Sequence, residues 1–270
     1  MHNPLVPESL EGWSLLHLMY RVKWADVRAL SDADRARLAE EAVAAVSSPD
    51  GPTAFAQLLG HKGDLMVTCF RRSFDALAAS QLAWSRSDLA RYLEPTTSYV
   101  SIVELGMYEM TAKIHEQLGA KFKPGSDEFE KAFDGEMETQ RGRVTSRLWG
   151  EVPPFRYVCF YPMNKRRGEA VNWYSEPFER RASMMREHGM IGRHYAGKVT
   201  QIISGSIGYD DWEWGVDLYA PDPVTFKKLI YEMRFDEASA KFAEFGPFYT
   251  GVHFSPSQLG TLLAGQVPSL

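Results

Sequence analysis

The sequence predicts an α+β protein made of two ferredoxin-like domains, with antiparallel sheets and helices on their outer faces. Segments of strand character alternate with segments of helical periodicity along the whole chain. The order of elements after residue 155 also resembles the order in the first half, and each half has the length of one small α+β unit. Strands and helices mixed in this way favour sheets that are covered on one face by helices.

The first domain, residues 1–110, is expected to run strand, helix, strand, helix, strand. The expected strands are 12–22, 61–71 and 99–105, and the expected helices are 32–46 and 74–84. Ser31 stands in the N-cap position of the first helix, since its side chain can accept a bond from a free backbone amide. The spacing in the second helix predicts one buried face, with Phe74, Leu77, Ala78 and Leu82.

Residues 111–150 are expected to connect the two halves and to hold one helix. A break at Lys123-Pro124-Gly125 precedes a charged, helix-prone stretch. The second domain, 151–270, is then expected to have strands 157–163, 199–207, 212–219 and 248–254, with helices 175–189 and 223–233. These three parts are the predicted domain organisation.

Composition excludes several classes of partner. The net charge is −5, so no overall basic field attracts nucleic acid or an anionic membrane, and an anionic substrate must meet locally placed Lys and Arg. The chain has no apolar run long enough for a membrane helix, and residues 1–8 lack the pattern of a signal peptide. We therefore expect a cytoplasmic protein. Cys69 and Cys159 lie in apolar runs and are expected to be buried free thiols.

His188 is the first candidate for chemistry. Phe178, Ala182 and Met185 form an apolar stripe at helical spacing, and His188 continues it three residues later. Gly189 is expected to end this helix as its C-cap. An imidazole facing an apolar space suits the axial position of a haem iron, although a half-buried core histidine would give the same pattern.

A second candidate is the segment YPMNK at the end of the strand 157–163. Period-two alternation places Tyr157, Cys159, Tyr161 and Met163 on one face, with Lys165 next if the strand continues. A phenol and an ammonium on one face could share an anionic substrate, but a tyrosine at a sheet end and a solvated lysine are the ordinary alternative. The stretch from Tyr231 to Phe242 is a third, in which Arg234, Asp236 and Glu237 read as a solvated helix junction.

These stretches together resemble the coproheme decarboxylases of the chlorite dismutase family. The resemblance is carried by YPMNK, by EHGMIGRHYAGKVTQIISGSIGYDDWEWGVDLYA and by EMRFDEASAKFAEFGPFYTG, and more thinly by LEGWSLLH, GHKGDLMV and TTSYVSIVELGMYE. It implies two ferredoxin-like domains of the dimeric α+β barrel type in each subunit. It also implies a homo-oligomer, usually a pentamer, that acts in haem biosynthesis.

The resemblance implies roles for individual residues. His188 would be the axial iron ligand, Tyr161 the catalytic tyrosine that becomes a radical, and Lys165 the group that assists at the reacting propionate. Met163 would lie against the macrocycle. Gln201 would take the distal position, where chlorite dismutases carry an arginine.

Further residues would complete the porphyrin site. Arg147 and Ser239 match positions that hold propionates, and Arg234 matches another arginine near the site. Pro162 and Asn164 belong to the same binding segment, and the family commonly has serine where this chain has Asn164. Arg147, Lys165 and Ser239 could form the polar rim that a tetracarboxylate ring needs despite the acidic net charge.

The implied reaction is the oxidative decarboxylation of two propionates of Fe-coproporphyrin III (coproheme) to vinyls, which gives haem b. Hydrogen peroxide is the implied oxidant, the substrate serves as its own cofactor, and a coproporphyrin ferrochelatase is the implied donor. Two alternatives remain: a chlorite dismutase or peroxidase on the same fold, and a haem-binding carrier without catalysis. Gln201 disfavours the first alternative because it is neither a cation nor a strong base.

Overall fold

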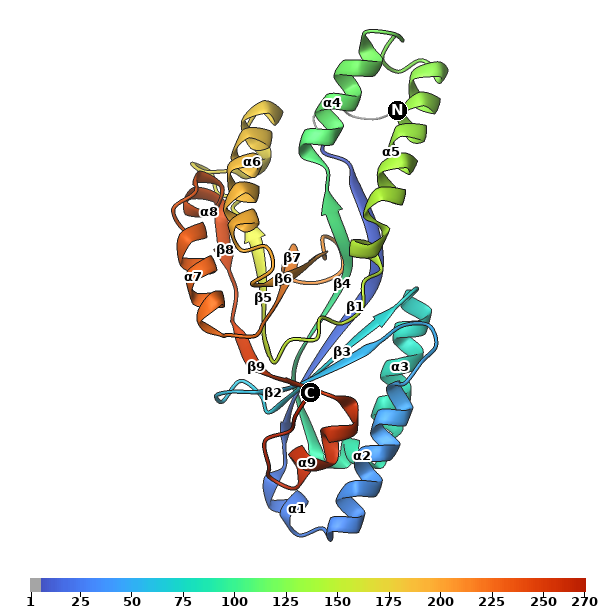
Figure 1. Cartoon of the computed structure of the whole chain (residues 1–270), viewed down its shortest axis with the longest axis vertical. Helices are drawn as coiled ribbons and strands as arrows, with labels where there is room; N and C mark the ends of the chain where they lie inside the picture. The colour runs from blue at the N-terminus through green and yellow to red at the C-terminus, as the bar shows by residue number, and fades with distance from the viewer. Residues whose placement is uncertain (1–5) are drawn as a thin grey trace.

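A computed structural model describes residues 6–270 (Figure 1). Residues 1–5 lie outside the described part of the chain. The expectation that residues 1–8 are not a signal peptide falls largely on these residues. The first half contains β1 (Ser9–Val22), α1 (Trp24–Arg28), α2 (Asp32–Val46), β2 (Thr53–Leu58), β3 (Leu65–Arg71), α3 (Phe74–Arg86) and β4 (Leu93–Gly106). Ser31 caps α2 as predicted, since its hydroxyl accepts a bond from the backbone amide of Asp34.

The first half has the ferredoxin-like strand order β4-β1-β3-β2, with all neighbours antiparallel. The sequence prediction missed β2, a six-residue strand without clear alternation of polar and apolar residues. Its residues from Thr53 to Gln57 pair with β3. Every residue of β3 is buried, because helices cover one face and the opposite sheet wall covers the other.

The second half repeats this arrangement. Its elements are β5 (Tyr157–Lys165), α6 (Phe178–His194), β6 (Thr200–Gly205), β7 (Trp214–Ala220), α7 (Val224–Met233), α8 (Glu237–Phe242), β8 (Ala243–Phe245), β9 (Tyr249–Phe254) and α9 (Leu259–Leu263). The strand order is β9-β5-β7-β6, the same order as in the first half. The predicted fold of two ferredoxin-like units is therefore confirmed. Short α8, β8 and α9 were not predicted.

The two units join edge to edge into one closed sheet. β2 pairs with β9 on one side, and β4 pairs with β6 on the other, so the strands β7-β6-β4-β1-β3-β2-β9-β5 return to β7. Closure leaves no open edge at these strands. Side chains that point inward fill the barrel, and among them the His17 ring stacks on Phe160 at 4.1 Å while its Nε2 lies 3.0 Å from Asp217.

The segment between the units is a helical hairpin. It consists of α4 (Tyr108–Gly119) and α5 (Asp127–Leu148), which project together from the barrel in Figure 1. Ile114, Leu118, Phe129 and Phe133 give the hairpin a small core of its own. The expectation of one helix was wrong, because Thr111, Ile114 and Leu118 give residues before Gly119 a buried helical face as well. The boundaries at residues 110 and 150 remain a proposal.

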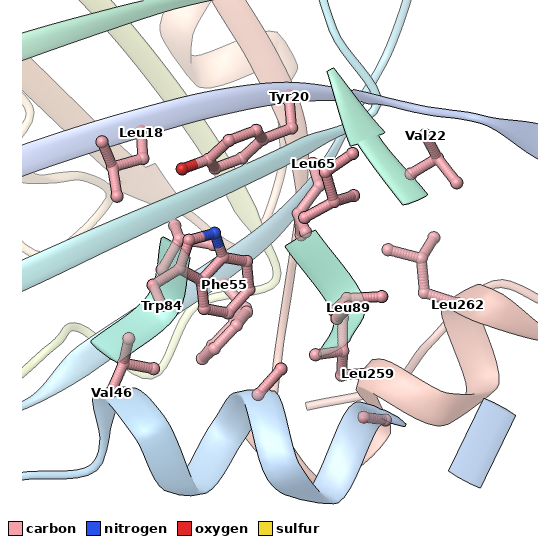
Figure 2. Packing of buried hydrophobic residues seen from close by; sticks show 14 of the residues in the cluster. Leu18, Tyr20, Val22, Val46, Phe55, Leu65, Trp84, Leu89, Leu259 and Leu262 are labelled. Atoms are coloured by element: carbon pink, nitrogen blue, oxygen red, sulfur yellow. The ribbon is translucent and has the colours of Figure 1, made fainter. Parts of the chain in front are cut away.

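Helices cover the barrel in two groups (Figure 1). α2, α3 and α9 pack on the first unit around a core that includes Tyr20, Phe55 and Trp84 (Figure 2). The predicted face of α3 was wrong at three of its four positions, since Leu77 is buried but Phe74, Ala78 and Leu82 are exposed, Leu82 by 65%. The inward stripe runs through Leu77, Ser80 and Trp84, because the large indole at the end of the helix determines which side faces the sheet.

α6, α7 and α8 form the second group, on the second unit. Cys69 lies in the core of the first unit and Cys159 in that of the second, and both are buried free thiols as predicted. None of the helices within residues 6–270 combines the length and apolar character needed to cross a bilayer.

Candidate functional site

Tyr161 lies at the centre of β5, beneath the helices of the second unit. The predicted alternation is confirmed, since Tyr157, Cys159, Tyr161 and Met163 all belong to one apolar cluster. The Tyr161 ring stacks on Phe248 with centroids 4.7 Å apart. Burial raises the pKa of the Tyr161 phenol above its usual range, so the group keeps its O–H bond at neutral pH.

Lys165 ends β5 as a buried cation, not as the solvated side chain of the ordinary alternative. It is 8% exposed, its Nζ donates to the carbonyl of Ala238 at 3.0 Å, and the same Nζ lies 4.5 Å from the ring centre of Trp173. Burial lowers the pKa of Lys165 to about 8, although the carboxylates of Asp236 and Glu213 act in the opposite direction. Lys165 therefore remains mainly protonated at pH 7.

His188 projects from the middle of α6. Phe178 and Ala182 are buried and Met185 is half-buried, so the predicted stripe is confirmed up to the imidazole, which is 29% exposed. The predicted end at Gly189 was wrong. α6 continues to His194 because Ile191, in the next turn, packs onto the apolar cluster around Tyr161.

The His188 imidazole is held by a buried carboxylate that the sequence prediction missed. Nδ1 lies 3.0 Å from Oδ2 of Asp236, whose side chain is fully buried. Burial by itself would raise the pKa of Asp236, but the hydrogen bonds from His188 and from the amide and hydroxyl of Ser239 outweigh it, and the pKa is lowered. Asp236 thus fixes the orientation of the imidazole and directs Nε2 away from the pair.

Asp236 occupies a position that differs from the one expected, whereas the predicted contact of Ser239 with a propionate stays a prediction. Asp236 is the N-cap of α8, where Oδ1 accepts a bond from the backbone amide of Ser239 at 2.8 Å. The Ser239 hydroxyl donates to Asp236 at 3.1 Å and lies 3.3 Å from Nδ1 of His188. The expected solvated junction was therefore wrong at Asp236. The N-cap pattern Asp-x-x-Ser was the sequence signal that could have indicated the buried turn.

One turn connects the imidazole and the ammonium. Within it, Asp236 bonds His188 on α6, and two residues later the carbonyl of Ala238 accepts the bond from Lys165 on β5. α6 and α8 pack against each other along this turn. The His188 imidazole and the Lys165 ammonium, which come from distant parts of the chain, are thus both held by the short turn from Asp236 to Ala238.

Arg234 lies near Tyr161, and Gln201 lies near the helix turn that follows His188. The Arg234 guanidinium stands over the ring of Phe245 at 4.8 Å, and its charge acts on the Tyr161 phenol. Gln201 is on β6, and its amide nitrogen would be 4.0 Å from a Cβ placed at Gly192, one turn after His188. The structure thus places seven of the predicted residues on the strands and helices of the second unit around β5 and α6: Tyr161, Met163, Lys165, His188, Gln201, Arg234 and Ser239.

The structure also places three other predicted residues, whose roles in binding stay predictions. Pro162 is buried beside Tyr161, and the side-chain oxygen of Asn164 accepts a bond at 2.7 Å from the amide of Glu213, which secures the β6–β7 connection. Arg147 is exposed in the last turn of α5, a helix that packs on β1 and β4. The contacts of the described residues do not bring Arg147 to Tyr161 or His188.

The residues present fit an iron porphyrin held through one axial imidazole. Within residues 6–270, no group of three His, Cys, Asp or Glu side chains could hold a metal ion. A porphyrin would supply the other ligands of an iron bound at Nε2 of His188. The carboxylate on Nδ1 is the usual partner of a metal-binding histidine.

Comparisons with known proteins identify relatives of this chain, and two of them are named for haem or coproheme. The family model described as chlorite dismutase matches residues 35–254. A coproheme decarboxylase of Staphylococcus saprophyticus is 39% identical over 268 residues, which cover 97% of this chain and 99% of the relative. A relative from Natronomonas pharaonis, named for haem binding, is 42% identical over 267 residues, and the match covers 96% of this chain but only 42% of that longer protein.

A solved structure has the same fold over nearly the full length. It belongs to a haem-binding protein from Thermus thermophilus, with a TM-score of 0.81, 39% sequence identity, and coverage of 98% of this chain and 100% of that chain. The family match covers well over half of the sequence, and the fold agrees with that of the solved relative. The chain therefore belongs to the chlorite dismutase family.

Proposed function

We propose that this protein acts in haem biosynthesis by oxidatively decarboxylating two propionates of Fe-coproporphyrin III, which gives haem b. The observation that carries the proposal is the shared turn at Asp236–Ala238, which contacts both His188 on α6 and Lys165 on β5, the strand that also holds the buried phenol of Tyr161. Near-full-length identity of 39% to a relative named coproheme decarboxylase supports the choice of substrate.

Each residue has a defined task in this proposal. Nε2 of His188 binds the iron and sets the position of the ring, while Asp236 maintains the orientation of the imidazole. The Lys165 ammonium pairs with the propionate that is to be cut, and a carboxylate beside it raises the pKa of Lys165 and keeps the cation charged. Gln201 borders the distal side without supplying charge. Ser239 supports the His188–Asp236 pair.

Tyr161 performs the hydrogen transfer. Iron of the bound substrate, together with hydrogen peroxide, supplies the oxidising equivalents. Oxidised Tyr161 takes a hydrogen atom from the β-carbon of the propionate and regains its O–H bond. The substrate then loses a second electron, and its carboxylate departs as CO2 to leave a vinyl group. One peroxide accepts the two electrons with protons and becomes two waters, so each propionate consumes one peroxide.

The test is conversion of coproheme by the purified protein with limiting peroxide, followed by the mass of the porphyrin. Two successive losses of CO2 and two hydrogens are expected. Tyr161→Phe keeps the packing and removes the O–H bond, so it is expected to abolish both losses. Tyr20→Phe, in the core of the first unit, is the matched control and is expected to react at the native rate. A Tyr161→Phe protein that formed haem b at the native rate would refute the mechanism.

Two other results would replace the proposed function. Rapid release of oxygen from chlorite at an oxygen electrode would identify a chlorite dismutase. A porphyrin that binds tightly but keeps its mass would identify a carrier.

The oligomer and the donor are proposals as well. A ring of five copies predicts five times the chain mass of 30.6 kDa in sedimentation equilibrium. Direct transfer from a coproporphyrin ferrochelatase predicts that loading of this protein is faster from the loaded donor than from free coproheme.

A further inference from the structure

The strand opposite Tyr161 contains a β-bulge. β5 pairs with β8 at Met163 and Phe245, and with β9 at Phe160 and Tyr249. From 160 to 163, β5 advances by three residues, whereas the opposite chain advances by four from 245 to 249. One extra residue therefore lies on the β8–β9 side, directly opposite Tyr161 and Pro162. Bulges of this kind redirect side chains and are frequent beside active sites.

The bulge brings two phenylalanines to the face of Tyr161. In a regular strand, side chains three residues apart point to opposite faces, so Phe245 and Phe248 would be separated by the sheet. Here the Phe248 ring is stacked on Tyr161 with an interplanar angle of 28°, and Phe245 is 5.7 Å from Tyr161 between centroids. The two phenyl rings also stack on each other at 6.2 Å. Together they enclose the phenol on more than one side.

A glycine makes this close approach feasible. The amide of Gly246 donates to the carbonyl of Pro162 at 2.9 Å, which fastens the bulge next to Tyr161. A Cβ at position 246 would lie 2.8 Å from Cγ of Pro162 and 2.9 Å from Cζ2 of Trp212. A larger residue there would require Pro162, Trp212 or the bulge itself to shift.

We propose that Phe245 and Phe248, placed by the bulge at Gly246, are positioning residues for Tyr161. They fix the plane of the phenol ring and so the direction of its O–H bond, which has to meet the reacting carbon of each propionate. The catalytic part of this inference rests on the proposed function, whereas the restraint on the ring is a property of the protein without substrate. A misplacement of about 1 Å can cost about 100-fold in rate, so a loosened phenol should react poorly.

The first experiment measures the ring in the substrate-free protein. Tyrosine labelled with carbon-13 in the ring reports flip rates by NMR, and Tyr161→Phe identifies the Tyr161 signal. Phe248→Leu, which removes the stacked ring but keeps an apolar side chain, is expected to raise the flip rate at least about tenfold. Phe254→Leu, on the same strand but in the core of the first unit, is the matched control and should leave the rate unchanged. An equal flip rate in Phe248→Leu and wild type would overturn the proposal.

The second experiment measures turnover with coproheme and peroxide. Phe248→Leu is expected to lower kcat about 10- to 100-fold, to leave KM for coproheme within about twofold, and to consume more peroxide per CO2 released. Gly246→Ala should act in the same direction, and Phe254→Leu should keep kcat within about twofold. A normal kcat in Phe248→Leu despite faster ring flips would overturn the catalytic part. If the wild type itself failed to convert coproheme, the proposed function would fail, and the NMR experiment would still decide the restraint on the ring.

Discussion

Lys165 is buried as a cation, and its replacement by methionine is expected to change how stability depends on pH. Burial lowers the pKa of Lys165 from 10.5 to about 8 in the folded protein. A pKa difference of one corresponds to about 1.4 kcal/mol, so charging Lys165 in the folded state costs about 3 kcal/mol relative to the unfolded chain. Below pH 8 both states carry the proton, and the folded protein bears this whole cost.

The sign of the effect follows from proton binding. Between pH 8 and 10.5 the folded protein has lost the Lys165 proton while the unfolded chain still holds it, so the free energy of unfolding rises with pH. From pH 7 to pH 10 the wild type should therefore gain about 2 to 3 kcal/mol relative to Lys165→Met. At pH 7 Lys165→Met escapes this cost but loses the bond to Ala238 and the contact with Trp173, so its gain in stability over the wild type should be less than about 3 kcal/mol.

Urea denaturation of the substrate-free protein, followed by tryptophan fluorescence at fixed protein concentration from pH 7 to 10, measures this difference. Lys227→Met, which replaces an exposed lysine on α7, is the matched control and should follow the wild type at every pH. A difference between wild type and Lys165→Met that stays constant within about 0.5 kcal/mol from pH 7 to 10 would contradict the reasoning.

Three further predictions concern the pair at His188 and the core of the first unit. Asp236→Asn should lower the free energy of unfolding at pH 7 by about 1.5 to 3 kcal/mol and raise the reduction potential of bound haem. Because the folded-state pKa of Asp236 is lowered, its contribution is lost as pH falls through that pKa, so acid should destabilise the wild type more than the variant; equal acid slopes would contradict this. Leu77→Ala should cost about 2 to 5 kcal/mol and Leu82→Ala under about 0.5 in urea denaturation, and similar losses would refute the assigned face of α3. Ser31→Ala should lower stability by about 1 kcal/mol through loss of the N-cap, whereas an unchanged midpoint would show that this bond contributes little.

Several parts of the site could be predicted from the sequence because they depend on local geometry. A strand alternates its side chains, so Tyr161 and Met163 had to share a face. A helix repeats its faces every three or four residues, so His188 had to follow Phe178 and Ala182 inward. The resemblance to a known family added the chemistry of these positions as an expectation, but it gave no contact between them.

Contacts between distant parts of the chain could not be predicted in this way. Asp236 looked like a solvated charge, and its burial depends on α6 closing over the turn that follows α7. The end of α6 depends on Ile191 finding the cluster around Tyr161, which overrides the weak local signal of Gly189. Arg147 is exposed in the last turn of α5, and its predicted contact with a propionate stays a prediction.

The sequence alone thus determined the two α+β units, the face of β5 that carries the phenol and the inward direction of the imidazole, since each follows from the repeat of a strand or a helix. Only the tertiary structure decided the closure of the barrel through β2–β9 and β4–β6, the carboxylate on His188 and the bulge opposite Tyr161. Pairing register and the burial of a polar group depend on which distant segments meet, and no local period of the chain encodes that.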